Sequence, residues 1–294
     1  MLLGALAFSL MAVCVKFASA HFNAAETVLW RGLLGLIIIF AVARQQRVLL
    51  RTRLLGMHLW RSVAGVTSLG GWFYAIAGLP LATAMTLNYT SSLWLAAFLL
   101  VAALVRPLRA PDSQGALAAA LLVGFGGVVL MLRPTIDQDQ WLAALVGLGS
   151  GMLAALAYLQ VQALARAGEP ELRTVFYFMI GTAVGGALLL PFTGLSPWAG
   201  WHCAWLLPMA VLAVLGQWCI TRAYSAGATL VVANLQYSGI VFGALFSVLV
   251  FGDTIDALGW LGMGLIVASG IAATVLRARA ESTTPPAEEP CTPR

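Results

Sequence analysis

Long apolar runs alternate with short polar breaks along almost the whole chain. Counting runs of about 17–25 residues, the length that crosses a bilayer as a helix, predicts ten transmembrane helices. The final stretch, 277–294, is polar and rich in proline, and it is predicted to be a disordered tail. The predicted spans are 2–20, 27–43, 60–78, 83–105, 114–132, 141–164, 173–191, 204–222, 229–251 and 257–276.

The fourth predicted span contains a polar patch, "TLNYTSSLW" at 86–94, inside an uncharged run. Hydroxyl and amide groups are costly in hydrocarbon unless a partner satisfies them. On a helix, steps of three and four residues place Thr83, Thr86, Thr90 and Trp94 on one stripe. This stripe should therefore face something other than lipid.

The second half of the chain repeats this pattern. "LNYTSSLWLAAF" (87–98) matches "LQYSGIVFGALF" (235–246), and Asn234, Tyr237 and Ser238 share one face of the ninth predicted span. Because each half contains five spans, the second copy enters the membrane in the opposite orientation. The predicted fold is an all-α membrane protein of ten transmembrane helices, arranged as two inverted five-helix repeats at 1–134 and 139–276, with a cytoplasmic tail at 277–294.

Two equivalent polar stripes, one from each repeat, predict a substrate-binding cavity near the middle of the membrane. An alternative stays open, because Ser and Thr in membrane helices often bond to a carbonyl of their own helix or join neighbouring helices. The candidate substrate-binding residues of the stripes are Thr86, Asn88, Tyr89, Thr90, Trp94, Asn234, Tyr237 and Ser238.

The composition indicates an integral membrane protein. Hydrophobic residues make up 61% of the chain and charged residues 9%, with a mean hydropathy of +0.92. In soluble domains about a quarter of the residues are charged. The basic residues are loop arginines and form no nucleic-acid patch, and the four cysteines have no paired spacing that suggests a disulfide framework or a metal site. We expect no cofactor and no bound metal.

The positions of the basic residues predict the orientation. With both termini in the cytoplasm, all of the 16 Lys and Arg residues except Lys16, Arg31 and Arg133 fall on the cytoplasmic side. Positive charge is concentrated on that side in membrane proteins. We therefore expect a multi-pass protein of the cell inner membrane with both termini inside.

Three charged residues near the ends of predicted helices are functional candidates. Lys16, the only lysine, either extends outward to the interface or faces the cavity and binds an anionic group of the substrate. Arg31 would pair with Glu26 or with a loop carbonyl. Arg31 and Asp253 are assigned as gating or structural charges.

Several motifs resemble the EamA family of the drug/metabolite transporter superfamily. They are "LPLATAMTLNYTSSLW" and "GATLVVANLQYSGIVF" in the fourth span of each half, "LWRGLLG" in the second span and "FGD" at 251–253. The first-half position that matches Asp253 falls at or beside Arg106, which departs from the family's pattern. The resemblance implies a secondary transporter that exports a small polar metabolite by alternating access, such as an amino acid or an amino-acid-derived compound, metal chelators included.

Other functions stay open as alternatives: a membrane-embedded enzyme, or an uptake permease for a vitamin or a nucleotide-like molecule. The sequence has no HExxH or GxSxG motif and no acidic pair within a span, which argues against an enzyme. It also lacks a Walker A lysine, so a gradient or a partner protein would supply the energy. Glycine pairs at 147/151 and 181/185 favour close packing within one chain over dimerisation. The expected partners are thus a small-molecule substrate and the lipid bilayer, around a monomer.

Overall fold

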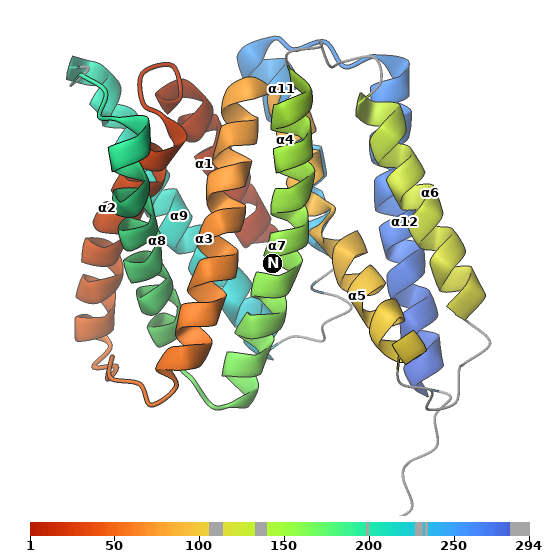
Figure 1. Ribbon diagram of the computed structural model, residues 1–294, viewed down its shortest axis with the longest axis horizontal. Coiled ribbons are helices and arrows are strands. Elements are labelled where there is room, and N and C mark those ends of the chain that lie inside the picture. Colours follow the sequence, from red (N-terminus) through yellow and green to blue (C-terminus); the bar gives the residue numbers. More distant parts are fainter. Residues whose placement is uncertain (106–113, 133–139, 198–199, 227–231, 233–234, 283–294) are drawn as a thin grey trace, which may run out of the picture.

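Helices occupy nearly all of the apolar runs that the sequence marks as spans (Figure 1). The computed structural model describes residues 1–105, 114–132, 140–197, 200–226, 232 and 235–282, and none of these residues belongs to a β-strand. The helices are α1 (Leu2–Ala18), α2 (Ala24–Gln45), α3 (Leu55–Gly78), α4 (Leu81–Tyr89), α5 (Ser91–Val105), α6 (Gln114–Leu132), α7 (Trp141–Arg166), α8 (Glu171–Thr193), the short 3₁₀ helix η2 (Gly200–Trp205), α9 (Leu206–Ala226), α11 (Ser238–Phe251) and α12 (Ala257–Ser282).

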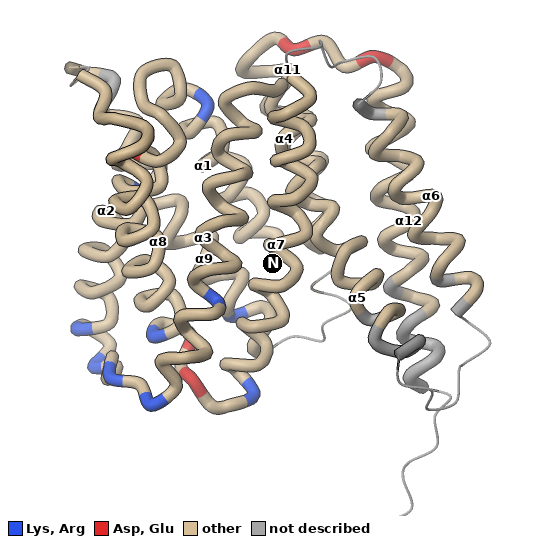
Figure 2. Tube along the Cα trace, viewed as in Figure 1, with Lys and Arg blue, Asp and Glu red and all other residues tan. Residues whose placement is uncertain are grey.

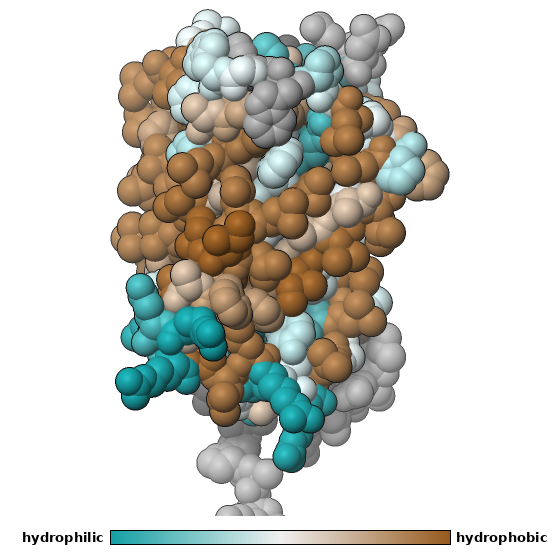
Figure 3. Space-filling view, turned by 90° about the vertical axis from the view of Figure 1, so that its left-hand side faces the viewer, coloured by the Kyte–Doolittle hydropathy of each residue, from teal (hydrophilic) through white to brown (hydrophobic). Residues whose placement is uncertain are grey.

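The length and hydropathy of these helices agree with a membrane protein. Among the described residues, four helices are long and apolar enough to cross a bilayer: α2, α7, α8 and the stretch Cys203–Ser225, which includes most of α9. The face on the left-hand side of Figure 1 is largely apolar over its height, and hydrophilic side chains gather toward its lower edge (Figure 3). The coarse prediction of an all-helical membrane protein is confirmed.

Helices that are distant in the sequence pack side by side. α2 packs against α8, α3 against α7, and α1 against α9. α6 and α12 pack on each other at one edge of the molecule, and α5 contacts both of them (Figure 1). The core of the molecule therefore lies between helices from the two halves of the chain.

Polar groups at the start of α2 define where this helix begins. Asn23 Oδ1 accepts a hydrogen bond from the Glu26 N–H, and Glu26 Oε2 accepts one from the Asn23 N–H, each at 2.9 Å. Such a capping box satisfies two of the backbone donors that the first turn of a helix leaves unpaired. The same glutamate also reaches the loop after α8, where the N–H and the hydroxyl of Ser196 donate to it at 2.6 Å each.

The fourth predicted span is not one continuous helix. It is broken at Thr90 into α4 and α5, so the prediction of an uninterrupted helix over 83–105 is wrong. The Thr90 hydroxyl donates to the Leu87 carbonyl at 2.6 Å, and α7 approaches the break closely. A Cβ at Gly151 would lie 2.6 Å from that carbonyl oxygen and 2.7 Å from the Thr90 hydroxyl. Glycine at this position lets the two backbones meet.

The ninth predicted span has a similar interruption. A turn at Tyr237 precedes α11, and the Ser238 hydroxyl donates to the Leu235 carbonyl at 2.6 Å. Thr90 and Ser238 occupy matching positions in the two sequence copies. The two interruptions therefore lie one residue apart when the two polar stretches are aligned.

Candidate functional site

A cavity lies between helices of both halves of the chain. Its walls come from α1, α2, α3, α4, α7, α8 and α9, and it offers about 60 Å³ to the centres of water-sized spheres, which is room for a few water molecules. Aromatic rings form part of the wall, among them Phe8, Trp72 and Phe178. The polar side chains that line the cavity include Arg31, Arg61, Ser68, Asn88, Tyr89, Tyr158 and Gln217.

Two arginines dominate the electrostatics of the cavity. Arg31 on α2 is 0% exposed and Arg61 on α3 is 3% exposed. Both guanidinium groups lie over the ring of Phe178 on α8, with Cζ 5.4 Å from the ring centroid for Arg31 and 3.6 Å for Arg61. Stacking on an aromatic face is favourable for a guanidinium group. The Phe178 ring therefore contacts both guanidinium groups.

Most of the guanidinium nitrogens of these two arginines have no hydrogen-bond partner in the described part of the chain. All three guanidinium nitrogens of Arg31, and Nε and Nη1 of Arg61, are buried without a hydrogen bond there. The ion pairs among the described residues join Glu169 to His58 and Arg173, and they include neither buried arginine. Two positive charges thus share the cavity without a counter-charge from these residues.

Neutral hydrogen-bonding groups form another part of the wall. Asn88 Nδ2 donates to Ser150 Oγ at 3.1 Å, and the Ser68 hydroxyl donates to the Ser150 carbonyl at 2.8 Å. Tyr158 stacks on Tyr224 with ring centroids 5.2 Å apart. These contacts hold side chains of α3, α4 and α7 in place around the cavity. Among the residues that the structure describes, no cluster of His, Cys, Asp or Glu is placed to hold a metal ion.

Three residues that the sequence singled out line this cavity: Asn88, Tyr89 and Arg31. Arg31 does so in an unexpected way. The expectation that it pairs with Glu26 is wrong, because the Glu26 carboxylate accepts its hydrogen bonds from Asn23 and Ser196, and the Arg31 guanidinium nitrogens have no such bond. The capping box and the loop after α8 use the acid, which leaves the arginine for the cavity.

The hydroxyls of the two polar stripes bond within their own helices. Thr86 Oγ1 donates to the Ala82 carbonyl at 2.7 Å, and the hydroxyls of Thr90 and Ser238 donate to carbonyls three residues earlier. None of the three lines the cavity. These three hydroxyls therefore bond to carbonyls of their own segment, as the alternative interpretation of the polar stripes expects.

Two other described stripe residues, Trp94 and Tyr237, also lie away from this cavity. The Trp94 ring packs edge-on against Phe125 of α6, with centroids 4.9 Å apart. Tyr237 is buried at 3% exposure and does not line the cavity. Asn234 lies outside the described residues.

Lys16 caps the end of another helix. Its Nζ donates to the carbonyls of Ile76 and Leu79 at 2.7 and 2.6 Å, and to that of Ala77 at 3.5 Å. A cation at a helix C-terminus satisfies unpaired carbonyls and interacts favourably with the helix dipole. Lys16 does not line the cavity. In the structure Lys16 therefore caps the end of α3, a role that neither interpretation of the sequence included.

Asp253 links the end of α11 to the start of α4. Its Oδ2 accepts a hydrogen bond from Ser247 Oγ at 2.5 Å, and Ser247 Oγ accepts one from the Ala82 N–H at 3.1 Å. These groups come from opposite halves of the chain, so the contact joins the halves near one end of the bundle. Its matching position in the first half, Arg106, lies outside the described residues.

Sequence reasoning missed the other residues of the cavity wall, among them Arg61, Tyr158, Phe178 and Gln217. For Arg61 a signal was present, because it lies inside the span predicted at 60–78, and an arginine within a membrane span usually marks a functional interior. It was instead counted among the basic residues of the cytoplasmic side. Gln217 carried a similar signal, because it is an amide inside the span predicted at 204–222. For Tyr158 and Phe178, nothing in the local sequence distinguishes them from residues that face lipid.

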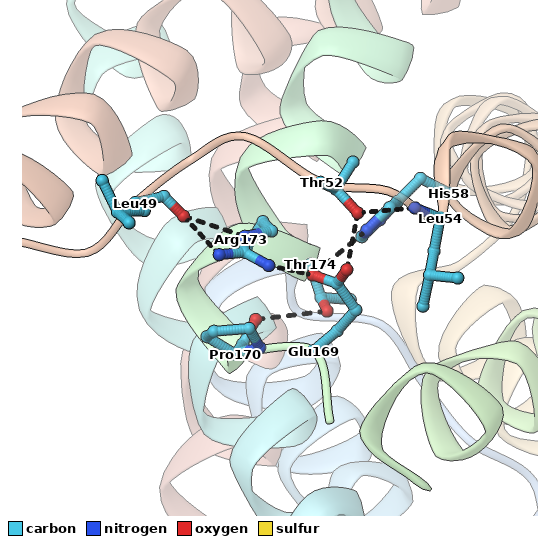
Figure 4. Close-up of polar contacts among 8 residues, drawn as sticks. All are labelled: Leu49, Thr52, Leu54, His58, Glu169, Pro170, Arg173 and Thr174. Atoms are coloured by element: carbon cyan, nitrogen blue, oxygen red, sulfur yellow. Dashed lines mark hydrogen bonds and ion pairs between the residues drawn. The ribbon is translucent and has the colours of Figure 1, made fainter. Parts of the chain in front are cut away.

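A second polar cluster joins the loop after α2 to the start of α8 (Figure 4). We call Leu49, Thr52, His58, Glu169 and Arg173 the loop network. Arg173 donates to the Leu49 carbonyl through Nε and Nη2 at 2.9 and 2.7 Å, and through Nη1 to Glu169 at 2.9 Å. Thr52 Oγ1 donates to the other oxygen of Glu169 at 2.5 Å, and His58 Nε2 lies 3.7 Å from the carboxylate.

The loop network changes the acidity of Glu169. Burial acts to raise the pKa of the Glu169 carboxyl. The hydrogen bonds from Thr52 and Arg173, with the positive charges of Arg173 and protonated His58, outweigh burial and hold its pKa below the usual value. The carboxylate form therefore stabilises this end of the bundle.

Known transporters resemble the chain over nearly its full length. It is 35% identical over 276 residues to the pseudopaline exporter CntI of Pseudomonas aeruginosa, which covers 92% of this chain and 93% of the exporter. It is 28% identical over 277 residues to a riboflavin transporter of Vibrio cholerae (92% and 89% of the two chains). An uncharacterized transporter of Helicobacter pylori is 26% identical over 282 residues (92% and 91%).

One solved structure has the same fold. The chain aligns with that crystal structure at a TM-score of 0.65 and 20% identity, covering 95% of this chain and 96% of the other. No protein-family model matches the chain. The transporters and the solved structure each align with more than nine-tenths of this chain.

Proposed function

Because the chain belongs to the family of membrane transporters that includes the pseudopaline exporter CntI, we propose that it exports a small polar metabolite from the cell as a secondary transporter. The substrate class is an amino acid or an amino-acid-derived compound, metal chelators included. The observation that carries this proposal is the 35% identity to an exporter over 92% of the chain. The polar cavity between helices of both halves is the substrate site in this proposal.

The proposed architecture is that of the EamA family, with ten spans in two inverted repeats at 1–134 and 139–276. The packing of the helices supports it. α3 packs against α7, and α1 packs against α9, so in both cases the third span of one half meets the first span of the other. The breaks at Thr90 and Tyr237 fall close to equivalent positions of the two halves, which is further support for the repeat.

In the proposed orientation, both termini face the cytoplasm and the protein spans the cell inner membrane. Most of the described Lys and Arg residues gather at the lower end of the bundle in Figure 2. Positive residues are enriched on the cytoplasmic side of membrane proteins. The lower end in that view, which includes the loop network, is therefore assigned to the cytoplasm.

Alternating access in this protein would open and close the two ends of the α2–α8 pair in turn. Glu26 at the start of α2 holds Ser196 in the loop after α8. Glu169 and Arg173 at the start of α8 hold the loop after α2. The cavity between these ends has room for only a few water molecules, so it must widen for a metabolite to bind.

An uptake permease for a vitamin is the second candidate, because riboflavin transporters of Vibrio cholerae and Rhizobium johnstonii are among the relatives, at 28% and 27% identity. Uptake of labelled riboflavin by cells that express the protein tests it directly. Uptake above that of cells without the protein supports the permease. The relatives given above are named as transporters, which disfavours a membrane-embedded enzyme.

Metabolite profiling of the culture medium tests the export proposal. Medium from cells with the gene should contain at least one metabolite that is depleted from the medium, and accumulates in the cells, when the gene is deleted.

Trp72→Phe should lower export about three- to tenfold when the protein is present at its normal abundance. The Trp72 indole N–H lies in the cavity wall and has no partner among the described residues. The loss of one neutral hydrogen bond to a ligand has an effect of this size.

A matched control lies on the same helix. Trp60 on α3 is 54% exposed, so Trp60→Phe should leave export unchanged. If no metabolite depends on the gene in either compartment, the export proposal is wrong. If both tryptophan variants lose export equally, the cavity is not the path.

A further inference from the structure

We propose that Arg31 and Arg61 form a two-point anion site that binds two carboxylate groups of one transported metabolite. The inference rests on the proposed function, because it concerns the ligand of the same cavity. It narrows the substrate class to an amino-acid-derived molecule that carries at least two carboxylates.

The burial of these two cations requires a partner. A guanidinium group that leaves water loses hydration that only hydrogen bonds or an opposite charge can replace. The Phe178 ring attracts both cations, but its face cannot accept several N–H bonds at once. The fork of N–H donors on Arg31 has no partner among the described residues. These donors are therefore available to a ligand.

Three described acids, Glu26, Glu169 and Asp253, are engaged elsewhere. Glu26 accepts hydrogen bonds from Asn23 and Ser196, and Glu169 accepts them from Thr52 and Arg173. Asp253 accepts one from Ser247. Within the described chain, neither arginine forms an ion pair. A bound molecule is thus the natural source of the counter-charge.

The geometry fits one ligand with two anionic groups. Both guanidinium carbons lie near one ring centroid, so their separation cannot exceed the sum of 5.4 and 3.6 Å. At such a separation two like charges repel each other in a medium of low polarity. A ligand with a single carboxylate would leave one cation unpaired, whereas two carboxylates neutralise both, each in the bidentate geometry that arginine prefers.

Neighbouring groups suit the rest of such a molecule. Gln217, Tyr158 and the Trp72 indole N–H lie in the same cavity wall, and the indole N–H has no partner in the described chain. These groups are neutral donors and acceptors, as an amine, amide or hydroxyl of the ligand requires. The cavity thus combines two charged points with a neutral polar wall.

Thermal unfolding of the purified protein in detergent tests the site. The probes are succinate, glutamate and iminodiacetate, each compared with its own mono-amide at about 10 mM and equal ionic strength, since a ligand that binds the native state raises the Tm. We expect at least one dicarboxylate to raise the Tm by about 2 °C or more, and its mono-amide to have less than half that effect. Inorganic phosphate is the third arm, because arginine also binds phosphate.

Arginine variants show whether the cavity is responsible. The Tm shift should disappear in Arg31→Gln and in Arg61→Gln. It should persist in Arg44→Gln, because Arg44 is exposed at the other end of α2 and also lies over a phenylalanine ring, that of Phe40, at 5.6 Å. Where a glutamine variant does not fold, Arg31→Lys and Arg61→Lys keep the charge but lose the fork, and should weaken dicarboxylate binding about tenfold or more.

Three outcomes would overturn the proposal: no dicarboxylate shifts the wild-type Tm more than its mono-amide, the shift survives in both cavity variants, or phosphate alone gives the shift. A structural role for the arginines predicts a different result, namely a lower Tm in every variant with an unchanged response to ligand.

The Gly65→Ala variant adds an independent check, because its Cβ would overlap Arg61 Nη1 and displace the guanidinium without removing its charge.

Profiling of the medium tests the anion site and the export proposal separately. Gene-dependent metabolites should carry at least two carboxyl groups, counted by the mass increase on methyl esterification. If gene-dependent metabolites appear but carry one carboxyl or none, the function stands and the anion site is wrong. If dicarboxylates bind the purified protein but no metabolite depends on the gene, the site stands and the export proposal is wrong.

Discussion

At the scale of single residues, hydrogen-bond partners separate structural groups from binding groups. The hydroxyls of Thr86 and Thr90 are satisfied by carbonyls of the same segment. The guanidinium nitrogens of Arg31 have no partner among the described residues, although the side chain is fully buried. A buried group without a partner loses free energy that a ligand can restore. We therefore propose that the arginines, more than the hydroxyls, define what the cavity binds.

The threonine stripe gives a test of this distinction. Thr86→Val replaces a hydroxyl that bonds to the Ala82 carbonyl with a methyl group of similar size. Side-chain hydrogen bonds in membrane proteins average about 0.6 kcal/mol, so stability in detergent should change by about that amount or less. Export should stay within about twofold of wild type. Both are measured on protein of equal abundance, by thermal unfolding and by medium profiling.

Gln217→Leu is the comparison for Thr86→Val, because Gln217 is buried and lines the cavity. It should lower export with a comparably small effect on folding. The reverse result, with export lost in Thr86→Val and retained in Gln217→Leu, would return the substrate site to the polar stripe.

At the scale of elements, each end of the α2–α8 pair is tied by polar contacts to the loop that follows the partner helix. A glutamate takes part at each end: Glu26 with Ser196 at one end, and Glu169 with Thr52 and Arg173 at the other. Apolar side chains gain little from packing against each other in lipid, so we expect such polar contacts to determine which ends stay closed. The two ties are the contacts that we expect to alternate during transport.

The loop network should make folding stability depend on pH. The folded-state pKa of Glu169 lies below its unfolded value. The stabilisation by its carboxylate is therefore fully present above the unfolded pKa, and is lost as the pH falls through the folded one. Between about pH 7 and pH 3 the Tm of the wild type should fall more than that of Glu169→Gln, since unperturbed glutamate titrates near pH 4.3.

Two further variants show which group causes the pH dependence of the Tm. Arg173→Gln should also reduce the pH dependence, because Arg173 is a hydrogen-bond donor to the Glu169 carboxylate. His58→Gln separates protonation of the imidazole, which lies 3.7 Å from the carboxylate, from that of the acid. Equal slopes of Tm against pH in the wild type and Glu169→Gln would refute the assignment.

At the scale of the whole molecule, the charge distribution supports one orientation. The described Lys and Arg residues lie mostly at the end of the bundle that contains the loop network (Figure 2). Lys16 is an exception, and it is held by the carbonyls at the end of α3. A basic residue with such a local role says little about topology, so the proposed orientation rests on the remaining arginines.

Reporter fusions test this orientation. A reporter that is active only in the periplasm, fused after Arg279, should stay inactive, because the positive residues assign that end to the cytoplasm. The same reporter fused after Gly194, in the loop that follows α8, should be active. A strong periplasmic signal after Arg279, or none after Gly194, contradicts the ten-span topology.

Part of the candidate site was predictable from the sequence. Asn88 and Tyr89 were found because a polar patch in an apolar span needs an explanation, and Arg31 because a charge in a span is costly. Arg61 carried the same signal inside the run 60–78, but it was used only to predict the orientation. The role of Lys16 was not predictable, because its partners are backbone carbonyls of a helix about 60 residues away.

The sequence by itself determined that the chain is a helical membrane protein and where most of its helices lie, because the length and apolarity of a span are local properties. Only the tertiary structure decided which face of each helix lines the cavity. In lipid, the buried face and the outer face of a helix are both apolar, so their pattern does not distinguish them. Leu121 is 6% exposed and its neighbour Leu122 is 74% exposed, a difference that depends on the rotation and packing of α6 against helices that are distant in the sequence.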